Sequence, residues 1–227
     1  MNKKIQAVIF DLDGTLIDSM SLWDELDRNF LKRRNIEPPD DLFENMKSNG
    51  IADLAIYFKT RFSLNESIED IIQEWVSEVN YAYSQKLKLR DGSEKLIKYL
   101  STNNIKLAVG TSNELSLTKA VLSSNNVIDF FKTITTGCSG LKGKPEPDIY
   151  LKTAKDLKVK PEDCIVIEDS LHGVNAGKNA GMTVFAINDK YSDFEKKEIQ
   201  KNSDIYFNNY FEIYAYLNKN SLMIENV

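Results

Sequence analysis

Histidine and cysteine are nearly absent from this chain. Among 227 residues there are one histidine, His172, and two cysteines, Cys138 and Cys164. The two cysteines have no metal-ligand spacing and are too few for a disulfide framework, so we expect both to be reduced thiols. A single histidine leaves little room for a histidine acid or base. The sequence therefore excludes the disulfide-rich scaffolds and disfavours histidine catalysis.

Long apolar runs and clusters of basic residues are also missing. The first apolar run ends at Asp11, too early for the core of a signal peptide, and no run is long enough to span a bilayer. The formal net charge is −5, the sequence pI is about 5.1, and the lysines are scattered. These features predict a cytoplasmic protein that binds neither nucleic acid nor a membrane.

The stretch that organises the chain lies near its beginning. Ile5–Phe10 is a short apolar run, which is typical of a strand buried on both faces of a parallel sheet. Asp11 and Asp13 follow it directly, and alternation along an extended chain predicts that both point to the same side. Gly14 allows a sharp turn after them. Two carboxylates this close repel, so they need a cation, a shared proton or a catalytic use.

Residues 18–88 show helical instead of strand-like patterns. Ser67 followed by Asp70 is a helix start signal, and Pro38-Pro39 marks a break between helices. Apolar residues recur at intervals of three and four in three stretches, Leu22 to Phe30, Ile51 to Phe58 and Ile68 to Val79. We interpret these stripes as packing surfaces between helices of an inserted helical unit.

From Asp91 onward, helical and strand-like segments alternate. Helices are predicted over Glu94–Ser101, Leu115–Ser124, Pro147–Asp156, Gly173–Ala180 and Phe211–Leu217, and strands over Ile105–Gly110, Thr133–Thr135, Cys164–Ile167, Thr183–Ile187 and Asp204–Phe207. This alternation predicts an α/β fold, a Rossmann-like parallel sheet with helices on both faces. We expect residues 1–17 and 89–227 to form that core, residues 18–88 to form a helical cap domain, and residues 219–227 to be a frayed tail.

Polar residues follow the predicted strands where a parallel sheet binds its ligands. They are Asp11 and Asp13 after the first strand, Thr111, Ser112 and Asn113 after the second, Lys144 in a later loop, and Glu168 and Asp169 after Cys164–Ile167. Individually, each could be a helix cap, a solvated charge or a turn residue. Their common placement after strands favours one shared site.

Phosphoryl transfer is the chemistry that needs this set. A phosphate monoester is a dianion, so a carboxylate nucleophile requires neutralising charge around it. Asp11 and Asp169 are suited to holding Mg²⁺, and Lys144 with Thr111 to meeting the phosphoryl oxygens. Asp11 would then attack phosphorus, and Asp13 would protonate the leaving oxygen and later deprotonate water.

The motifs resemble those of the haloacid dehalogenase superfamily over nearly the whole chain. Asp-Leu-Asp-Gly-Thr-Leu-Ile-Asp-Ser at residues 11–19 looks like its first motif, Val109–Asn113 its second, Gly143–Asp148 its third and Glu168–Gly173 its fourth. The resemblance implies a small helical cap and an enzyme related to phosphoglycolate phosphatases and β-phosphoglucomutases. It implies that Asp11 is the nucleophile and that Asp13 is the acid and base. Asp11, the Asp13 carbonyl and Asp169 would hold Mg²⁺, with Glu168 behind them.

The substrate is less well indicated. Similar β-phosphoglucomutases carry a histidine after the first motif, where this chain has Trp23, and an arginine in the cap, where it reads Lys47-Ser-Asn-Gly-Ile51. Both departures weaken the mutase interpretation and favour a Mg²⁺-dependent phosphatase of a small phosphorylated metabolite such as a sugar phosphate. We expect the protein to be a monomer. Trp23, Lys47 and Asn113 are the candidate substrate contacts. A phosphomutase, a haloacid dehalogenase and a non-catalytic phosphate-sensing module are the alternatives.

Overall fold

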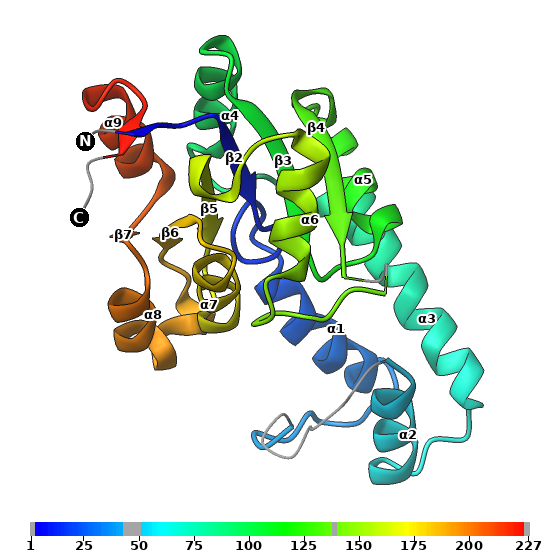
Figure 1. Ribbon diagram of the computed structural model, residues 1–227. Coiled ribbons are helices and arrows are strands. Elements are labelled where there is room, and N and C mark those ends of the chain that lie inside the picture. Colours follow the sequence, from blue (N-terminus) through cyan, green and yellow to red (C-terminus); the bar gives the residue numbers. More distant parts are fainter. Residues whose placement is uncertain (1–2, 43–50, 138–139, 225–227) are drawn as a thin grey trace. The chain divides into compact units, whose positions relative to one another are not determined.

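The chain divides into two compact units. The computed structural model describes residues 3–42, 51–137 and 140–224 (Figure 1). One unit comprises Met1–Ser19 with Leu87–Val227, and the other comprises Met20–Lys86. The sequence predicts the second unit at residues 18–88, so each of its boundaries differs by two residues from the observed one. We call the first the core unit and the second the cap unit.

A six-stranded parallel sheet forms the centre of the core unit (Figure 1). Its strands, in spatial order, are β4 (Phe131–Thr136), β3 (Lys106–Thr111), β2 (Ala7–Phe10), β5 (Cys164–Glu168), β6 (Thr183–Ile187) and β7 (Ile205–Phe207). Phe10 is in register with Val109 of β3 and Ile167 of β5. The residues that follow β2, β3 and β5 therefore emerge at the same edge of the sheet.

Helices cover both faces of the sheet. Helices α6 (Asp148–Leu157), α7 (Leu171–Asn179) and α8 (Lys196–Asn202) pack on one face, and α4 (Ser93–Thr102) and α9 (Tyr210–Lys219) on the other, while α5 (Leu115–Ser124) packs on β4. Short 3₁₀ turns span Ile128–Phe130, Pro161–Asp163 and Lys190–Glu195. Ile9, Val166 and Val184 are fully buried in the apolar cluster that the sheet forms with α6 and α7. The predicted Rossmann-like α/β fold is confirmed.

The cap unit is helical, as its periodicity predicts. Helices α1 (Met20–Lys32), α2 (Ile51–Arg61) and α3 (Ile68–Tyr81) are followed by a π-helical turn at Ala82–Lys86. Ser67 caps α3, since its side chain accepts a hydrogen bond from the Asp70 backbone N–H. The rings of Phe30, Phe58 and Trp75 pack together, with centroids of Trp75 5.1 and 5.2 Å from the other two. The apolar stripes therefore do pack helix against helix.

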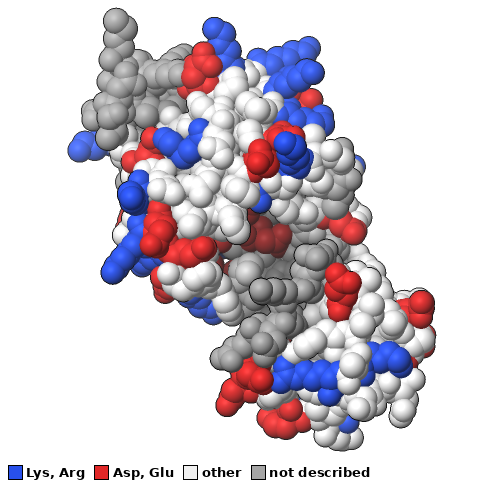
Figure 2. All heavy atoms as spheres, turned by 60° about the horizontal axis from the view of Figure 1, so that its bottom comes forward, with Lys and Arg blue, Asp and Glu red and all other residues white. Residues whose placement is uncertain are grey.

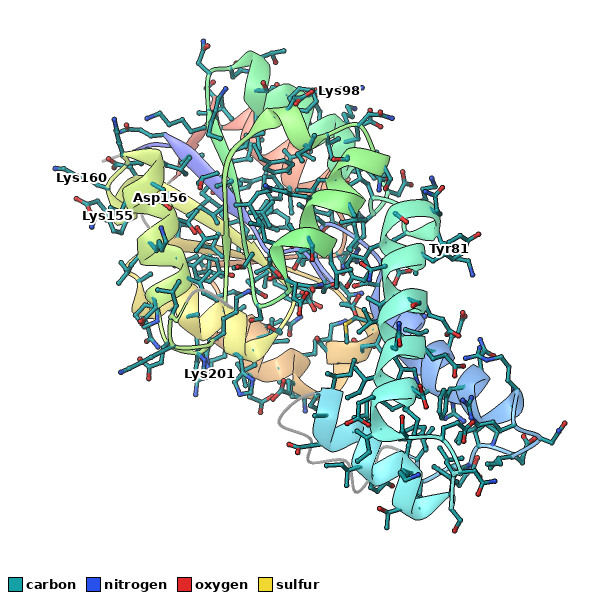
Figure 3. All side chains as sticks on the ribbon, turned by 90° about the vertical axis from the view of Figure 1, so that its right-hand side faces the viewer. Tyr81, Lys98, Lys155, Asp156, Lys160 and Lys201 are labelled. Atoms are coloured by element: carbon teal, nitrogen blue, oxygen red, sulfur yellow. The ribbon has the colours of Figure 1, made fainter. Side chains whose placement is uncertain are left out.

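Three details differ from the sequence-based expectations. The expected tail at 219–227 instead contains strand β8 (Met223–Ile224), which pairs antiparallel with β1 (Lys3–Lys4). Backbone pairing with β1 orders Met223 and Ile224, and local sequence patterns do not report such distant partners. Residues 225–227 lie outside the described residues, so the expectation for them stays a prediction. The first central strand begins at Ala7, not Ile5. Helix α8 was not predicted, because Ile199 is its one buried residue and side chains such as Lys201 point away from the sheet (Figure 3).

The described surface has mixed charge. Figure 2 shows lysine and arginine interspersed with aspartate and glutamate on the face it draws. None of the described helices combines the length and the apolar character that crossing a membrane requires.

Candidate active site

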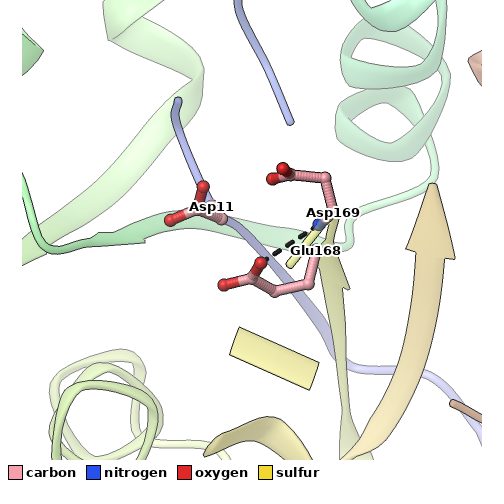
Figure 4. A group of neighbouring side chains, drawn as sticks. All are labelled: Asp11, Glu168 and Asp169. Carbon is pink, nitrogen blue, oxygen red and sulfur yellow. Dashed lines mark hydrogen bonds between the residues drawn. The ribbon is translucent and has the colours of Figure 1, made fainter. Parts of the chain in front are cut away.

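Three carboxylates meet at the carboxyl edge of the sheet (Figure 4). Asp11 follows β2, and its backbone N–H is bonded to the Ile167 carbonyl of β5 at 3.0 Å. Glu168 is the last residue of β5, and Asp169 follows it. Ligand atoms of the three side chains lie within 4.8 Å of one another, and all three residues are buried. Parallel register between β2 and β5 thus produces a concentrated negative charge with little access to water.

Lys144 partly neutralises this charge. Its Nζ lies 2.6 Å from Asp11 Oδ1 and 2.6 Å from Glu168 Oε1. Burial alone would lower the pKa of Lys144, but the Asp11 and Glu168 carboxylates outweigh it and raise the pKa well above its ordinary value. Burial raises the pKa of Asp11 well above its usual range, although Lys144 opposes that shift. Lys144 therefore remains a cation at the side of Asp11.

The Glu168 carboxylate is held from several directions. Its Oε1 accepts a hydrogen bond from Tyr150 at 2.6 Å in addition to the one from Lys144. Its Oε2 accepts from the Asp169 backbone N–H at 3.0 Å and from the Ser170 hydroxyl at 3.2 Å. A Cβ at Gly173 would lie 1.9 Å from the carboxylate carbon, so only glycine leaves room there. Glu168 therefore fixes Lys144 in place.

Asp169 is held by the loop that contains the first motif. The Thr15 hydroxyl donates to Asp169 Oδ1 at 2.6 Å. Gly14 has a φ of 78°, and a Cβ there would lie 2.5 Å from Asp169 Oδ2, so close approach of this backbone requires glycine. Burial, with the Glu168 charge adding to it, raises the pKa of Asp169 to about 7.

Asp13 has a more polar environment than Asp11. It is half-buried, and its carboxylate accepts hydrogen bonds from the Ser19 hydroxyl at 2.6 Å and from Asn113 Nδ2 at 2.8 Å.

The Thr111 hydroxyl accepts a hydrogen bond from the Asn113 backbone N–H at 3.0 Å, which leaves the hydroxyl hydrogen of Thr111 to donate.

The other residues singled out in the sequence are Ser112, Asn113, Lys47, Trp23 and the two cysteines. Ser112 is exposed directly after β3. The Asn113 side chain donates a hydrogen bond to Asp13. Its predicted contact with substrate is not tested by the structure and stays a prediction. Lys47 and Cys138 lie outside the described residues, and Trp23 belongs to α1 although its side chain is not described. Cys164 is a buried thiol that forms no disulfide, as expected, and donates to the Lys160 carbonyl.

Sequence reasoning missed the supporting side chains. Thr15 stands inside the first motif and could have been noticed there. Ser19 likewise ends that motif, where it bonds to Asp13. Tyr150 is an ordinary helix residue in the sequence, and only the fold brings it to Glu168.

The donor set fits a hard divalent cation. All three clustered ligands are carboxylates, which Mg²⁺ prefers in proteins. Burial raises the pKa of both Asp11 and Asp169, which indicates negative charge that the protein itself compensates incompletely. A cation bound between these carboxylates would supply that compensation.

Comparison with known proteins assigns the family. Residues 8–187 match the family model of haloacid dehalogenase-like hydrolases. The chain is 29% identical to a phosphorylated carbohydrates phosphatase of Thermotoga maritima, over 78% of this chain and 82% of that protein. It is 31% identical to β-phosphoglucomutase of Bacillus subtilis, over 78% and 81%.

A solved structure from Thermotoga maritima, described as a candidate β-phosphoglucomutase, covers 95% of this chain and 99% of its own, with 26% identity and a TM-score of 0.84. The match extends across the strands that position the carboxylate cluster. The chain therefore belongs to the haloacid dehalogenase-like hydrolases and is an enzyme of that family.

Proposed function

We propose that the protein is a Mg²⁺-dependent phosphatase that hydrolyses a small phosphorylated metabolite, such as a sugar phosphate, through an aspartyl-phosphate on Asp11. The observation that carries the proposal is the placement of Asp11, a buried carboxylate 2.6 Å from Lys144, at the carboxyl edge of the sheet. Relatives that are phosphatases of phosphorylated carbohydrates and hexitols support it.

In the first step, an Asp11 carboxylate oxygen attacks phosphorus and the bond from phosphorus to the ester oxygen breaks. Asp13 gives its proton to that oxygen, so the alcohol leaves neutral. Lys144 is next to the nucleophile, where it can also meet a phosphoryl oxygen, and the Thr111 hydroxyl can donate to another. Ser112 is the third candidate for phosphate binding.

In the second step, water attacks the phosphorus of the aspartyl-phosphate. Asp13, now ionised, takes a proton from the water, and the bond between phosphorus and Asp11 breaks to release inorganic phosphate. Ser19 and Asn113 hold the Asp13 carboxylate in one orientation for both transfers. Asp11 returns as a carboxylate beside Lys144.

Asp11, Asp169 and the Asp13 backbone carbonyl are the proposed holders of Mg²⁺. Glu168 is a further candidate by proximity, although its hydrogen bonds favour a role behind the ligands. Bound Mg²⁺ would neutralise the repulsion between a phosphate dianion and this acidic pocket.

Phosphorus NMR tests the proposed function. The protein with Mg²⁺ is incubated with sugar phosphates, phosphoglycolate, glycerol phosphates and nucleoside monophosphates. Inorganic phosphate should accumulate with at least one ester, and chelation of Mg²⁺ should stop it. If no inorganic phosphate is released from any of these esters, the proposal is contradicted.

A phosphomutase is the second candidate, because β-phosphoglucomutase of Bacillus subtilis is 31% identical to this chain. The same spectra separate the two activities. New ester signals without free phosphate would identify a mutase, since the phosphoryl group then passes to a second hydroxyl instead of to water.

Asp13→Asn should separate chemistry from binding. We expect turnover to fall by about 10²- to 10⁴-fold, the usual contribution of a positioned acid and base. Affinity for Mg²⁺ should change little, because the asparagine keeps the backbone carbonyl and the hydrogen bond from Ser19. Steady-state kinetics and Mg²⁺ titration calorimetry measure the two effects. Equal losses of turnover and of Mg²⁺ affinity would show that Asp13 acts through the metal site alone.

Mg²⁺ affinity should depend on pH through Asp169. The pKa of this carboxyl is raised to about 7, so the folded, metal-free protein keeps a proton that Mg²⁺ must displace. Apparent affinity should therefore rise at least about tenfold per pH unit below pH 7, because the raised pKa of Asp11 adds to the effect of Asp169. Calorimetry at pH 5.5 to 8 in buffers of different ionisation enthalpy would count the released proton. A flat profile would contradict this assignment.

A further inference from the structure

The loop after β2 is held by backbone hydrogen bonds of its own and by side chains from elsewhere in the core unit. Within it, the Gly14 N–H bonds to the Ile17 carbonyl at 3.0 Å and the Ile17 N–H to the Leu12 carbonyl at 3.0 Å. The carbonyls of Gly14 and Thr15 are bonded instead by side chains from distant parts of the core unit. Buried backbone carbonyls need such partners, so these side chains determine the path of the loop.

Arg90 and Tyr210 supply the partners. Arg90 Nη1 donates to the Gly14 carbonyl, across 76 residues of sequence, and the Tyr210 hydroxyl donates to the Thr15 carbonyl at 3.1 Å. The Arg90 backbone N–H also bonds to the Leu16 carbonyl at 2.8 Å. Arg90 thus holds the loop at two points, immediately after the two aspartates.

The guanidinium of Arg90 is itself anchored to the end of β6. Its Nη2 donates to the Asn188 carbonyl at 2.6 Å, and Asp189 Oδ2 lies 3.6 Å from Nη1. The Asn188 side chain is bonded in turn by Tyr206 and Lys196. A planar guanidinium can join two carbonyls in fixed directions, which a lysine ammonium on a flexible chain cannot do equally well.

The chain segment that carries Arg90 is equally constrained. Asn125 accepts a hydrogen bond from the Leu89 N–H at 3.2 Å and donates one to the Leu87 carbonyl at 3.0 Å. Asn125 therefore holds the backbone that precedes Arg90 in place.

We propose that Arg90 is a positioning residue for the active-site loop, joining the Gly14 carbonyl to the end of β6 and so setting where Asp11 and Asp13 lie. Its effect on turnover rests on the proposed function, whereas its effect on the loop does not. Small displacements of a reacting group cost large factors in rate, so the loss should appear in kcat.

The test compares Arg90→Met and Arg90→Lys with the native protein. Arg90→Met should lower kcat by about 10- to 100-fold with KM changed less than threefold, and Arg90→Lys should lie between. In the metal-free protein, amide hydrogen exchange at Gly14 and Ile17 should become at least about tenfold faster in Arg90→Met. Lys106→Met is the matched control, because Lys106 donates to the Leu157 carbonyl at the opposite end of β3. In Lys106→Met, both the kinetic constants and the amide exchange rates at Gly14 and Ile17 should equal those of the native protein.

Several outcomes would overturn the proposal. Unchanged exchange at Gly14 and Ile17 would do so, as would a higher KM at constant kcat, which would instead indicate substrate contact. If Arg90→Met does not fold, Arg90→Lys carries the comparison. If the native protein hydrolyses none of the esters, the proposed function fails and the exchange measurement alone decides the role of Arg90.

Discussion

Asp11→Asn is expected to abolish phosphate release, with a loss on the order of 10⁴- to 10⁶-fold, as for the removal of other catalytic nucleophiles. The amide has the shape of the carboxylate but cannot form the aspartyl-phosphate. Lys144 and Thr111, the proposed phosphate contacts, remain in place, so KM should change far less than kcat. Phosphorus NMR and a phosphate-release assay measure the effect. Asp156→Asn, on the surface of α6 and paired with Lys152, is the matched control with full activity expected (Figure 3).

The same variant should stabilise the metal-free protein. Burial raises the pKa of Asp11, so the folded state loses stability as pH rises from the ordinary aspartate value through that raised pKa. Asparagine has no charge to desolvate, so the melting temperature at pH 8 should rise, by roughly 2–4 °C for each 1 kcal/mol gained. A lower melting temperature at pH 8 would contradict this account. Residual turnover near the native rate would remove Asp11 as nucleophile.

Lys144→Met is expected to damage both activity and stability. The variant leaves Asp11 and Glu168 without the ammonium that lies 2.6 Å from each. Removing one partner of a buried ion pair typically costs about 3–5 kcal/mol. If Lys144 meets a phosphoryl oxygen as proposed, its loss should also cost about 10²- to 10³-fold in kcat. Thermal unfolding and steady-state kinetics measure the two losses.

The loss of stability in Lys144→Met should depend on pH. Without the cation, the raised pKa of Asp11 rises further, so the folded protein is protonated there and less penalised at pH 5.5 than at pH 8. Saturating Mg²⁺ should recover part of the loss at pH 8. Lys152→Met, which removes an exposed partner of Asp156, should show neither effect. Equal destabilisation at both pH values would contradict this explanation.

The sequence predicted the architecture of the core unit well. Each central strand lies where an apolar run occurs, and α5 and β6 have the predicted bounds. This works because strand and helix periodicity depend on neighbours within four residues, and because parallel strands bring their carboxyl ends to one edge. The sequence alone therefore predicts that Asp11, Thr111, Glu168 and Asp169 lie at one edge of the sheet.

The sequence by itself determined which chemical groups lie at the ends of the strands, because that follows from local pattern and chain direction. Only the tertiary structure decided how they are held. Lys144 bridges Asp11 and Glu168 across 133 and 24 residues, and Tyr210 reaches Thr15 across 195. Such contacts arise from strand register and helix packing, and so do the raised pKa values of Asp11 and Asp169, since burial is a property of the folded chain.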